Sequence, residues 1–253
     1  MIRKVLLSVI VLAVIMTYCN VNKHKNDTFQ KNPVDELVRD MNSVPEFSII
    51  LYDMNFDEAK DIYQHKYQIV KHVSQPKDTI LSEITKWYPV PQTFFDEHTK
   101  DMGMEIVTKA NGKVTKEAAP PGYSNYVGNP QYGRWNNTGG GSFWEFYGKY
   151  AMMSSLFNMA FMPVRYSMWN DYNTSFRGRG QGFYGNGRYG SNSAFSKCHN
   201  PNGMGNRSGF ASRVQSRVSR SKISPFSNAS RVGRSTNRVS NFSFRSRGGG
   251  FGK

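Results

Sequence analysis

The chain has 253 residues, enough for one or two globular domains, and its net charge of +15 is unevenly placed. Residues 1–171 hold 18 acidic and 18 basic side chains, whereas the last 82 residues hold 15 basic side chains and no acid. Two cysteines are too few for a disulfide-stapled small protein or a four-cysteine zinc site. Beyond the N-terminus, no stretch is long and apolar enough for an ordinary membrane span.

The first 19 residues have the pattern of a bacterial export signal. Arg3 and Lys4 precede a run of 12 uncharged, apolar-rich residues at 5–16. As a helix, this run covers only about 18 Å, whereas the hydrocarbon core of a membrane is ~30 Å thick. Cys19 stands where a lipoprotein signal is cut and its cysteine acylated, and we favour lipidation of Cys19. Ordinary cleavage after Cys19 stays open, because Tyr18 is larger than the usual preceding residue.

A polar tether over residues 20–32 leads into a predicted small α+β domain over residues 33–118. The patterns predict a helix from Pro33 to about residue 41, strands over 47–56, 62–73 and 80–90, and a helix over 91–102. Asn111-Gly112, between the runs 104–109 and 113–118, favours a hairpin with a tight type I′ turn. We therefore expect a small antiparallel sheet with one or two covering helices.

Residues 119–172 form an aromatic, glycine- and tyrosine-rich segment. Ser142 and Glu145 have the spacing of a capping box, which predicts an aromatic-rich hydrophobic helix over 143–162 that Pro163 stops. Three interpretations remain open: a helix in the core or a dimer interface, a helix lying in a bilayer surface, or a re-entrant or ligand-lining helix. For the bilayer interpretation, the membrane-interface candidates are Trp144, Tyr147, Phe157 and Trp169.

The same segment carries a resemblance. PPGYSNYVGNPQYGRW, then SFWEFYGKY, then a Gly/Ser/Arg-rich tail closing in GGGFGK, resembles a family of uncharacterised bacterial envelope proteins that are often predicted lipoproteins. The resemblance runs from about residue 47 to the C-terminus and is densest at 120–151. It implies a location in the cell envelope, and it implies no reaction, substrate or catalytic residue.

Residues 173–253 are predicted to be a disordered basic tail, because Gly, Ser, Arg and Asn offer too little apolar area to offset the entropy of folding. Arginine pairs with phosphate or carboxylate, and the interspersed rings can stack on flat groups. The polyanion-binding candidates are Arg177, Arg179, Arg188, Arg213, Arg217, Arg220, Arg245 and Arg247. The expected partner is anionic membrane lipid or another envelope polyanion, and the alternatives are an inert solubilising spacer and binding of single-stranded nucleic acid.

No catalytic pattern stands out. The chain contains no HExxH motif, its predicted folded half contains no GxSxG motif, and Cys198-His199 falls in the predicted tail. We therefore expect no enzymatic activity, no cofactor, no metal site and no catalytic residue. The leading hypothesis is an exported envelope protein, membrane-anchored if Cys19 is acylated and otherwise periplasmic or secreted. A nucleic-acid-binding protein is the alternative, and an enzyme with a pocket in the aromatic segment is a third possibility.

Overall fold

The computed structural model describes residues 31–73 and 78–203, which form an α+β fold around one antiparallel sheet. Its strand order is β3-β2-β1-β5-β6, and β4 pairs with the other end of β2. The strands are β1 (Glu46–Asp57), β2 (Ile62–Val73), β3 (Thr79–Ile84), β4 (Tyr88–Val90), β5 (Glu105–Ala110) and β6 (Lys113–Thr115). A separate hairpin consists of β7 (Gly133–Thr138) and β8 (Gly141–Phe146).

The helices are all short. They are α2 (Pro33–Asp40), α3 (Gln92–Glu97), the 3₁₀ turn η1 (Gly148–Tyr150), α4 (Met152–Leu156), α5 (Tyr166–Asp171), the π-helical turn η2 (Tyr172–Phe176) and α6 (Ala194–His199). In the described ranges 31–73 and 78–203, no helix is both long and apolar enough to cross a membrane.

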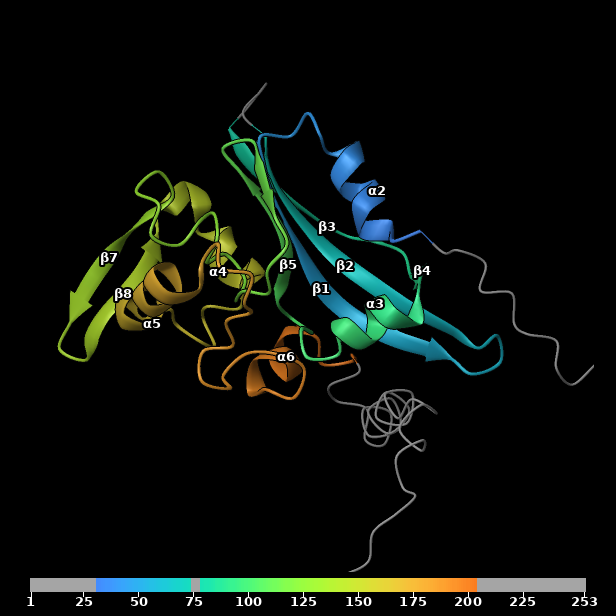
Figure 1. Cartoon of the computed structure of the whole chain (residues 1–253). Helices are drawn as coiled ribbons and strands as arrows, with labels where there is room; N and C mark the ends of the chain where they lie inside the picture. Colours follow the sequence, from blue (N-terminus) through green and yellow to red (C-terminus); the bar gives the residue numbers. More distant parts are fainter. Residues whose placement is uncertain (1–30, 74–77, 204–253) are drawn as a thin grey trace, which may run out of the picture.

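The sheet is covered on both faces. Phe47, Ile49 and Leu51 alternate along β1 and belong to a core cluster shared with Val34 of α2 and Phe95 of α3. In Figure 1, α2 and α3 lie on one side of the sheet, while β7, β8, α4 and α5 lie on the other. A strand that is buried on both sides needs apolar residues at successive positions, which is why β1 contains the run FSIIL after Glu46.

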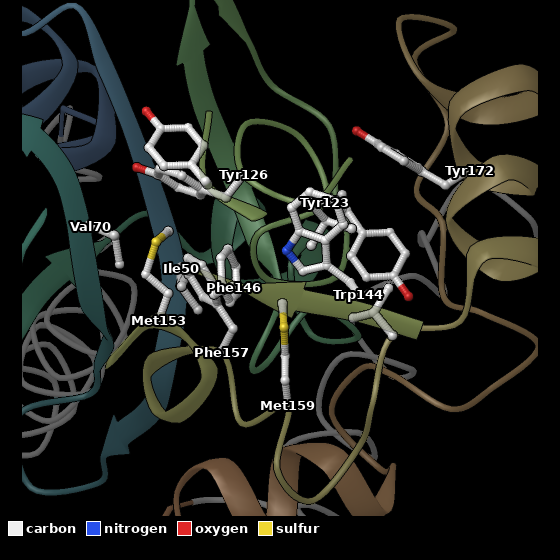
Figure 2. Close-up of a cluster of buried hydrophobic side chains, with 14 of the residues drawn as sticks. Ile50, Val70, Tyr123, Tyr126, Trp144, Phe146, Met153, Phe157, Met159 and Tyr172 are labelled. Atoms are coloured by element: carbon white, nitrogen blue, oxygen red, sulfur yellow. The ribbon is translucent and has the colours of Figure 1, made fainter. Parts of the chain in front are cut away.

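Residues 119–203 form the layer on the second face. Ile50 of β1 and Val70 of β2 belong to a cluster with Phe157 and many other aromatic side chains of this layer. Figure 2 shows Ile50 and Val70 of the sheet beside Met153, Phe146 and Phe157. We call this cover the aromatic layer.

The sheet follows its sequence-based prediction closely. The predicted strands 47–56 and 62–73 appear as β1 and β2, and Pro33 begins α2 with the Asn32 side chain as its N-cap. Asn111 and Gly112 have φ angles of 50° and 76° in the two-residue turn between β5 and β6, as a type I′ hairpin requires. The predicted strand 80–90 is broken at 85–87 into β3 and β4, and the predicted helix 91–102 shortens to α3.

The predicted helix over 143–162 is wrong. Residues 141–146 form β8, which pairs with β7 across a two-residue turn, and only η1 and α4 follow. Glu145 caps nothing: its carboxylate lies across the hairpin, 3.2 Å from the Asn136 amide and 3.6 Å from Arg134. The cross-strand partners therefore satisfy the side chain that the capping-box interpretation assigned to a helix start.

The expected start of a disordered tail at residue 173 is also wrong. Residues 173–203 belong to the described fold, and Phe183, Tyr189 and Phe195 are buried in the aromatic layer. These widely spaced rings supply the apolar area that the composition alone did not suggest. The segment that remains outside the described residues begins at 204.

Candidate functional site: a polar pocket at the edge of the sheet

A small pocket of about 190 Å³ opens where β1 begins. Its wall combines the start of β1, the β5–β6 turn, the segment 124–129, α5 and the residue after η2. The polar or amphipathic side chains that line it include Glu46, Asn111, Asn125, Asn129, Trp169 and Arg177. The sheet thus supplies a carboxylate, and the aromatic layer supplies an indole and a guanidinium.

Asn125 holds its part of the wall through two backbone contacts. Its amide nitrogen donates to the carbonyl oxygens of Phe47 on β1 (3.2 Å) and Lys109 on β5 (3.0 Å). The two carbonyls fix the orientation of the amide, because its oxygen would be repelled there. The Asn125 Oδ1 atom is buried and has no hydrogen-bond partner among the described residues. Asn125 thus has an unsatisfied acceptor that is buried behind the pocket wall.

Trp169 reaches the pocket because residue 128 is a glycine. A Cβ atom at Gly128 would lie 2.2 Å from Cζ2 of the indole, so any larger residue would displace the ring. Within the described part of the chain, the buried Nε1–H of Trp169 has no acceptor. Arg177 donates to the Ser124 carbonyl at 2.8 Å and to Asn173 Oδ1 at 3.1 Å. The indole N–H of Trp169 is therefore a buried, unsatisfied donor, and Arg177 is a restrained cation at the pocket.

Glu46 connects the pocket to a network of polar side chains between the layers. The Tyr132 hydroxyl donates to Glu46 Oε2 at 2.8 Å and lies 3.2 Å from His72 Nδ1. His72 Nε2 lies 2.5 Å from Asp78 Oδ1. The Tyr132 hydroxyl thus links Glu46 to His72, and His72 links Tyr132 to Asp78.

Asp78 ends the network at the surface. Its Oδ2 accepts hydrogen bonds from the Tyr150 hydroxyl at 2.7 Å and from Lys149 at 2.9 Å. Hydrogen bonds from His72, Tyr150 and Lys149 hold the pKa of Asp78 well below its ordinary value. The network thus joins the start of β1, the residue before β3 and the aromatic layer, and it fixes the Glu46 carboxylate at the pocket.

Two further titratable residues, Glu105 and His65, are buried in the fold. Burial raises the pKa of Glu105, whose carboxylate accepts hydrogen bonds from the backbone N–H groups of Gly122 at 2.7 Å and Ser124 at 3.4 Å. On the helix-covered face, burial lowers the pKa of His65 to about 3. Among residues 31–73 and 78–203, no group of three or more His, Cys, Asp or Glu side chains is placed to hold a metal ion.

The structure separates the four membrane-interface candidates. Trp144 and Phe157 are buried in the aromatic layer, so neither presents its ring to a bilayer in this fold. Tyr147 is exposed, and Trp169 lies at the pocket. The predicted helix over 143–162, on which the bilayer interpretation depended, does not form, so that interpretation is wrong.

The polyanion-binding candidates lie in two parts of the chain. Arg177 is exposed, but it donates a hydrogen bond to the Ser124 carbonyl of the folded part of the chain. Arg179 donates to the Thr174 carbonyl at 2.8 Å. Arg188 is half-buried near the buried Tyr189. Five other candidates, Arg213, Arg217, Arg220, Arg245 and Arg247, lie outside the described residues, as does the lipidation candidate Cys19.

Sequence patterns did not single out Glu46 or Asn125. Glu46 is an isolated acid before a strand, and Asn125 is one of several asparagines in an aromatic run. Comparison with protein-family models, with curated proteins and with solved structures gave no match. The case for a function therefore rests on the residues of this chain.

Proposed function

We propose that this protein is an exported component of a bacterial cell envelope, acylated on Cys19, that acts by binding rather than by catalysis. Its C-terminal segment contacts anionic lipid or another envelope polyanion. The support for export is the charged start, the short apolar run and the cysteine that follows it.

The separation of charge along the chain is the observation that carries the binding role. Residues 31–203 contain 18 basic and 17 acidic side chains, whereas residues 204–253 contain 11 basic side chains and no acid. Several basic side chains of residues 31–203 form ion pairs with acids. Lys71 lies 3.0 Å from Glu83, and Lys116 lies 2.6 Å from Asp35. Most of the net charge, 11 of the 15 positive charges, thus belongs to 204–253, and each basic residue held near an anionic surface contributes about 1 kcal/mol.

The location is tested by intact mass and N-terminal analysis of protein recovered from bacterial membranes. A chain beginning at Cys19 with the added mass of acyl groups is the expected result. A chain that starts at Met1 and is recovered from the cytosol would overturn the export proposal.

Binding is tested with a non-acylated chain that begins at Asn20, so that vesicle association reports the protein surface alone. We expect it to bind vesicles of phosphatidylglycerol and phosphatidylcholine far better than phosphatidylcholine alone, with a log affinity that falls linearly with log salt. Replacing Arg213, Arg217, Arg220, Arg245 and Arg247 by Gln is expected to weaken this binding by roughly three to four orders of magnitude.

The matched control removes the same number of charges from residues 31–203. It replaces five exposed basic residues by Gln: Lys60, Lys86, Lys100, Lys113 and Arg134. We expect this variant to lose much less affinity than the tail variant. Equal losses in both would contradict a tail-specific contact. Tighter binding to a single-stranded oligonucleotide than to anionic vesicles at the same salt would favour the nucleic-acid alternative instead.

A further inference from the structure

The edge of the sheet at β3 offers unpaired backbone groups. In an antiparallel pair, alternate residues turn their N–H and C=O groups toward the same neighbouring strand. The N–H of Thr85 donates to the Tyr67 carbonyl of β2 at 2.9 Å, so the odd-numbered residues of β3 face β2. Ile80, Ser82 and Ile84 therefore turn their backbone groups away from β2. In the described part of the chain, no backbone hydrogen bond meets these outward groups.

The side chains of β3 are apolar for those of an edge strand. Leu81 is 46% exposed and Ile84 is 50% exposed. They lie on opposite faces of the sheet, Leu81 across from Lys71 and Ile84 across from Gln68. The only charged residue of the strand is Glu83, which lies 3.0 Å from Lys71 in an ion pair. Exposed aliphatic side chains beside an unpaired backbone favour the addition of a further strand at this edge.

The other strand edges of the described fold carry features that discourage pairing. β4, which continues the β3 side of the sheet, contains Pro89, and proline has no N–H to offer. β6, at the opposite edge, has three residues, begins with Lys113 and is followed by Lys116. The outer strand of the hairpin, β7, ends in the exposed polar residues Asn137 and Thr138. β3 has neither lysine nor proline, so it is the edge best suited to pairing.

The sequence of β3 is complementary to a second copy of itself in one antiparallel register. When Ser82 lies opposite Ser82 of the second copy, Ile80 lies opposite Ile84, and the outward backbone groups of the two strands meet. Each exposed Ile84 then packs beside the Ile80 side chain of the other copy. Just beyond the strand, the same register places Asp78 opposite Lys86 of the second copy. The register thus matches aliphatic side chains with each other and an acid with a base.

We propose that the chain forms a two-fold dimer by antiparallel pairing of β3 with β3 of a second copy, so that the two sheets become one continuous sheet. The contact uses residues of the folded part alone and does not depend on the proposed envelope role or on the tail. It is limited to one edge strand of each copy, so the dimer is weak, with a dissociation constant in roughly the micromolar range.

The oligomeric state is measured by analytical ultracentrifugation of the non-acylated chain that begins at Asn20, at concentrations from below to above the micromolar range. We expect a reversible equilibrium between monomer and dimer. Ser82→Pro removes the two N–H groups that cross between the copies and is expected to weaken dimerisation about tenfold or more. Ser82→Ala is the matched control. It also loses the hydroxyl that accepts from Gln68 at 3.1 Å, but it keeps the N–H and is expected to dimerise as the unaltered chain does.

A second pair of variants tests the side-chain contact. Ile84→Lys places a charge against Ile80 of the second copy and is expected to weaken dimerisation about tenfold or more. Val114→Lys adds the same charge on β6, at the opposite edge of the sheet, where the valine is 36% exposed. We expect Val114→Lys to leave the equilibrium unchanged.

Cysteine substitution tests the register. A chain that begins at Asn20 contains one cysteine, Cys198, so each cysteine variant also carries Cys198→Ser. In the proposed register the Cα atoms of the two Ser82 residues lie about 5.5 Å apart, within reach of a disulfide. The two Thr79 residues lie about 20 Å apart. Under mild oxidation we expect Ser82→Cys to form a disulfide-linked dimer and Thr79→Cys to remain single chains on a non-reducing gel.

A chain that stays monomeric over the whole concentration range overturns the proposal. A dimer that both Ser82→Pro and Ile84→Lys leave unchanged also overturns it, because the contact then lies elsewhere. Equal cross-linking at positions 79 and 82 would contradict the register, and assemblies that grow beyond a dimer would contradict the closed two-fold pair. Far-UV circular dichroism of each variant shows that a loss of association is not a loss of fold.

Discussion

Glu105 lies between the sheet and the aromatic layer as a fully buried carboxyl group. Its backbone pairs with Ala119, and its side chain accepts hydrogen bonds from the N–H groups of Gly122 and Ser124. Burial raises the pKa of Glu105 above the ordinary value of 4.5, because the charged form loses its hydration. The folded chain therefore holds the Glu105 proton more tightly than the unfolded chain does.

This difference makes stability depend on pH. Because the folded-state pKa is the higher one, the free energy of unfolding falls as pH rises from about 4.5 through the raised pKa of Glu105. We expect Glu105→Gln, which cannot ionise, to lack this decline. The measurement is the urea midpoint between about pH 4 and about pH 8. The control is Glu97→Gln, which removes an exposed carboxylate. If the stability of Glu105→Gln still declines with rising pH, Glu105 is not the cause of the decline.

Gly122 faces two restrictions at once. Its φ angle is 83°, and a Cβ atom there would lie 2.8 Å from Cδ2 of the Phe157 ring. Gly112 has a similar φ of 76° but open space around it. We expect Gly112→Ala to cost about 1–2 kcal/mol from backbone strain, and Gly122→Ala to cost about 1–3 kcal/mol more from overpacking. Chemical denaturation measures both, and equal costs would mean that the ring moves aside freely.

At the scale of single elements, residues 152–162 combine a buried and an exposed face within a few positions. Phe157 is 1% exposed, whereas Phe161 is 53% exposed. We expect Phe157→Ala to lower the free energy of unfolding by about 3–5 kcal/mol, because it leaves a cavity in the aromatic layer. Phe161→Ala is expected to change it by less than about 0.5 kcal/mol. The opposite order in denaturant midpoints would contradict this packing.

The strands of the sheet were predictable because their signals are local. β1 and β2 are runs of β-branched and aromatic residues of the right length, and Asn111-Gly112 specifies its turn through the φ angles that it tolerates. Pro33 and Asn32 likewise fix the start of α2 within a few residues. Each of these elements is determined mainly by its own sequence.

The segment after residue 140 was not predictable in this way. Placed on a helix, the run 143–162 is apolar around most of the circumference, and this pattern predicts a buried helix. In the structure, the buried Trp144 and Phe146 alternate with the exposed Glu145, as a strand requires. The turn signal was Gly139-Gly140, two flexible residues between Thr138 and its partner Gly141. The choice between helix and strand was settled by packing against α5 and the preceding strand, which a local pattern does not contain.

The pocket was even less predictable. Glu46, Asn125 and Trp169 come from three distant parts of the chain and meet only because the aromatic layer closes over the start of β1. Arg177 was singled out, but for a different role. Side chains that are selected by tertiary contact leave no spacing to find in a single sequence.

At the scale of the whole molecule, one sheet serves two hydrophobic clusters. Neighbouring residues of β1, Ile49 and Ile50, belong to opposite clusters, so neither cover can leave without exposing the same strand. We expect residues 33–203 to unfold in one cooperative transition. Phe95→Ala, on the face covered by helices, and Phe157→Ala, in the aromatic layer, should each lower the urea midpoint of this single transition.

Two probes measure this cooperativity. Tryptophan fluorescence reports chiefly the aromatic layer, which includes Trp135, Trp144 and Trp169, and far-UV circular dichroism reports the sheet and helices together. We expect the two urea curves to coincide in the unaltered chain and in both variants. An aromatic layer that melts earlier than the sheet would show two domains divided near residue 118.

The two-sided sheet also has a consequence for synthesis. Ile50 leaves the ribosome about a hundred residues before Phe157, which is about 5–20 s at the usual rates of translation. During that time α2 and α3 can already cover one face of the sheet. The other face, with Ile50 and Val70, stays uncovered until the aromatic layer has been synthesised. A nascent chain halted before residue 119 would therefore present an open, partly apolar sheet surface, which is the kind of surface that chaperones bind.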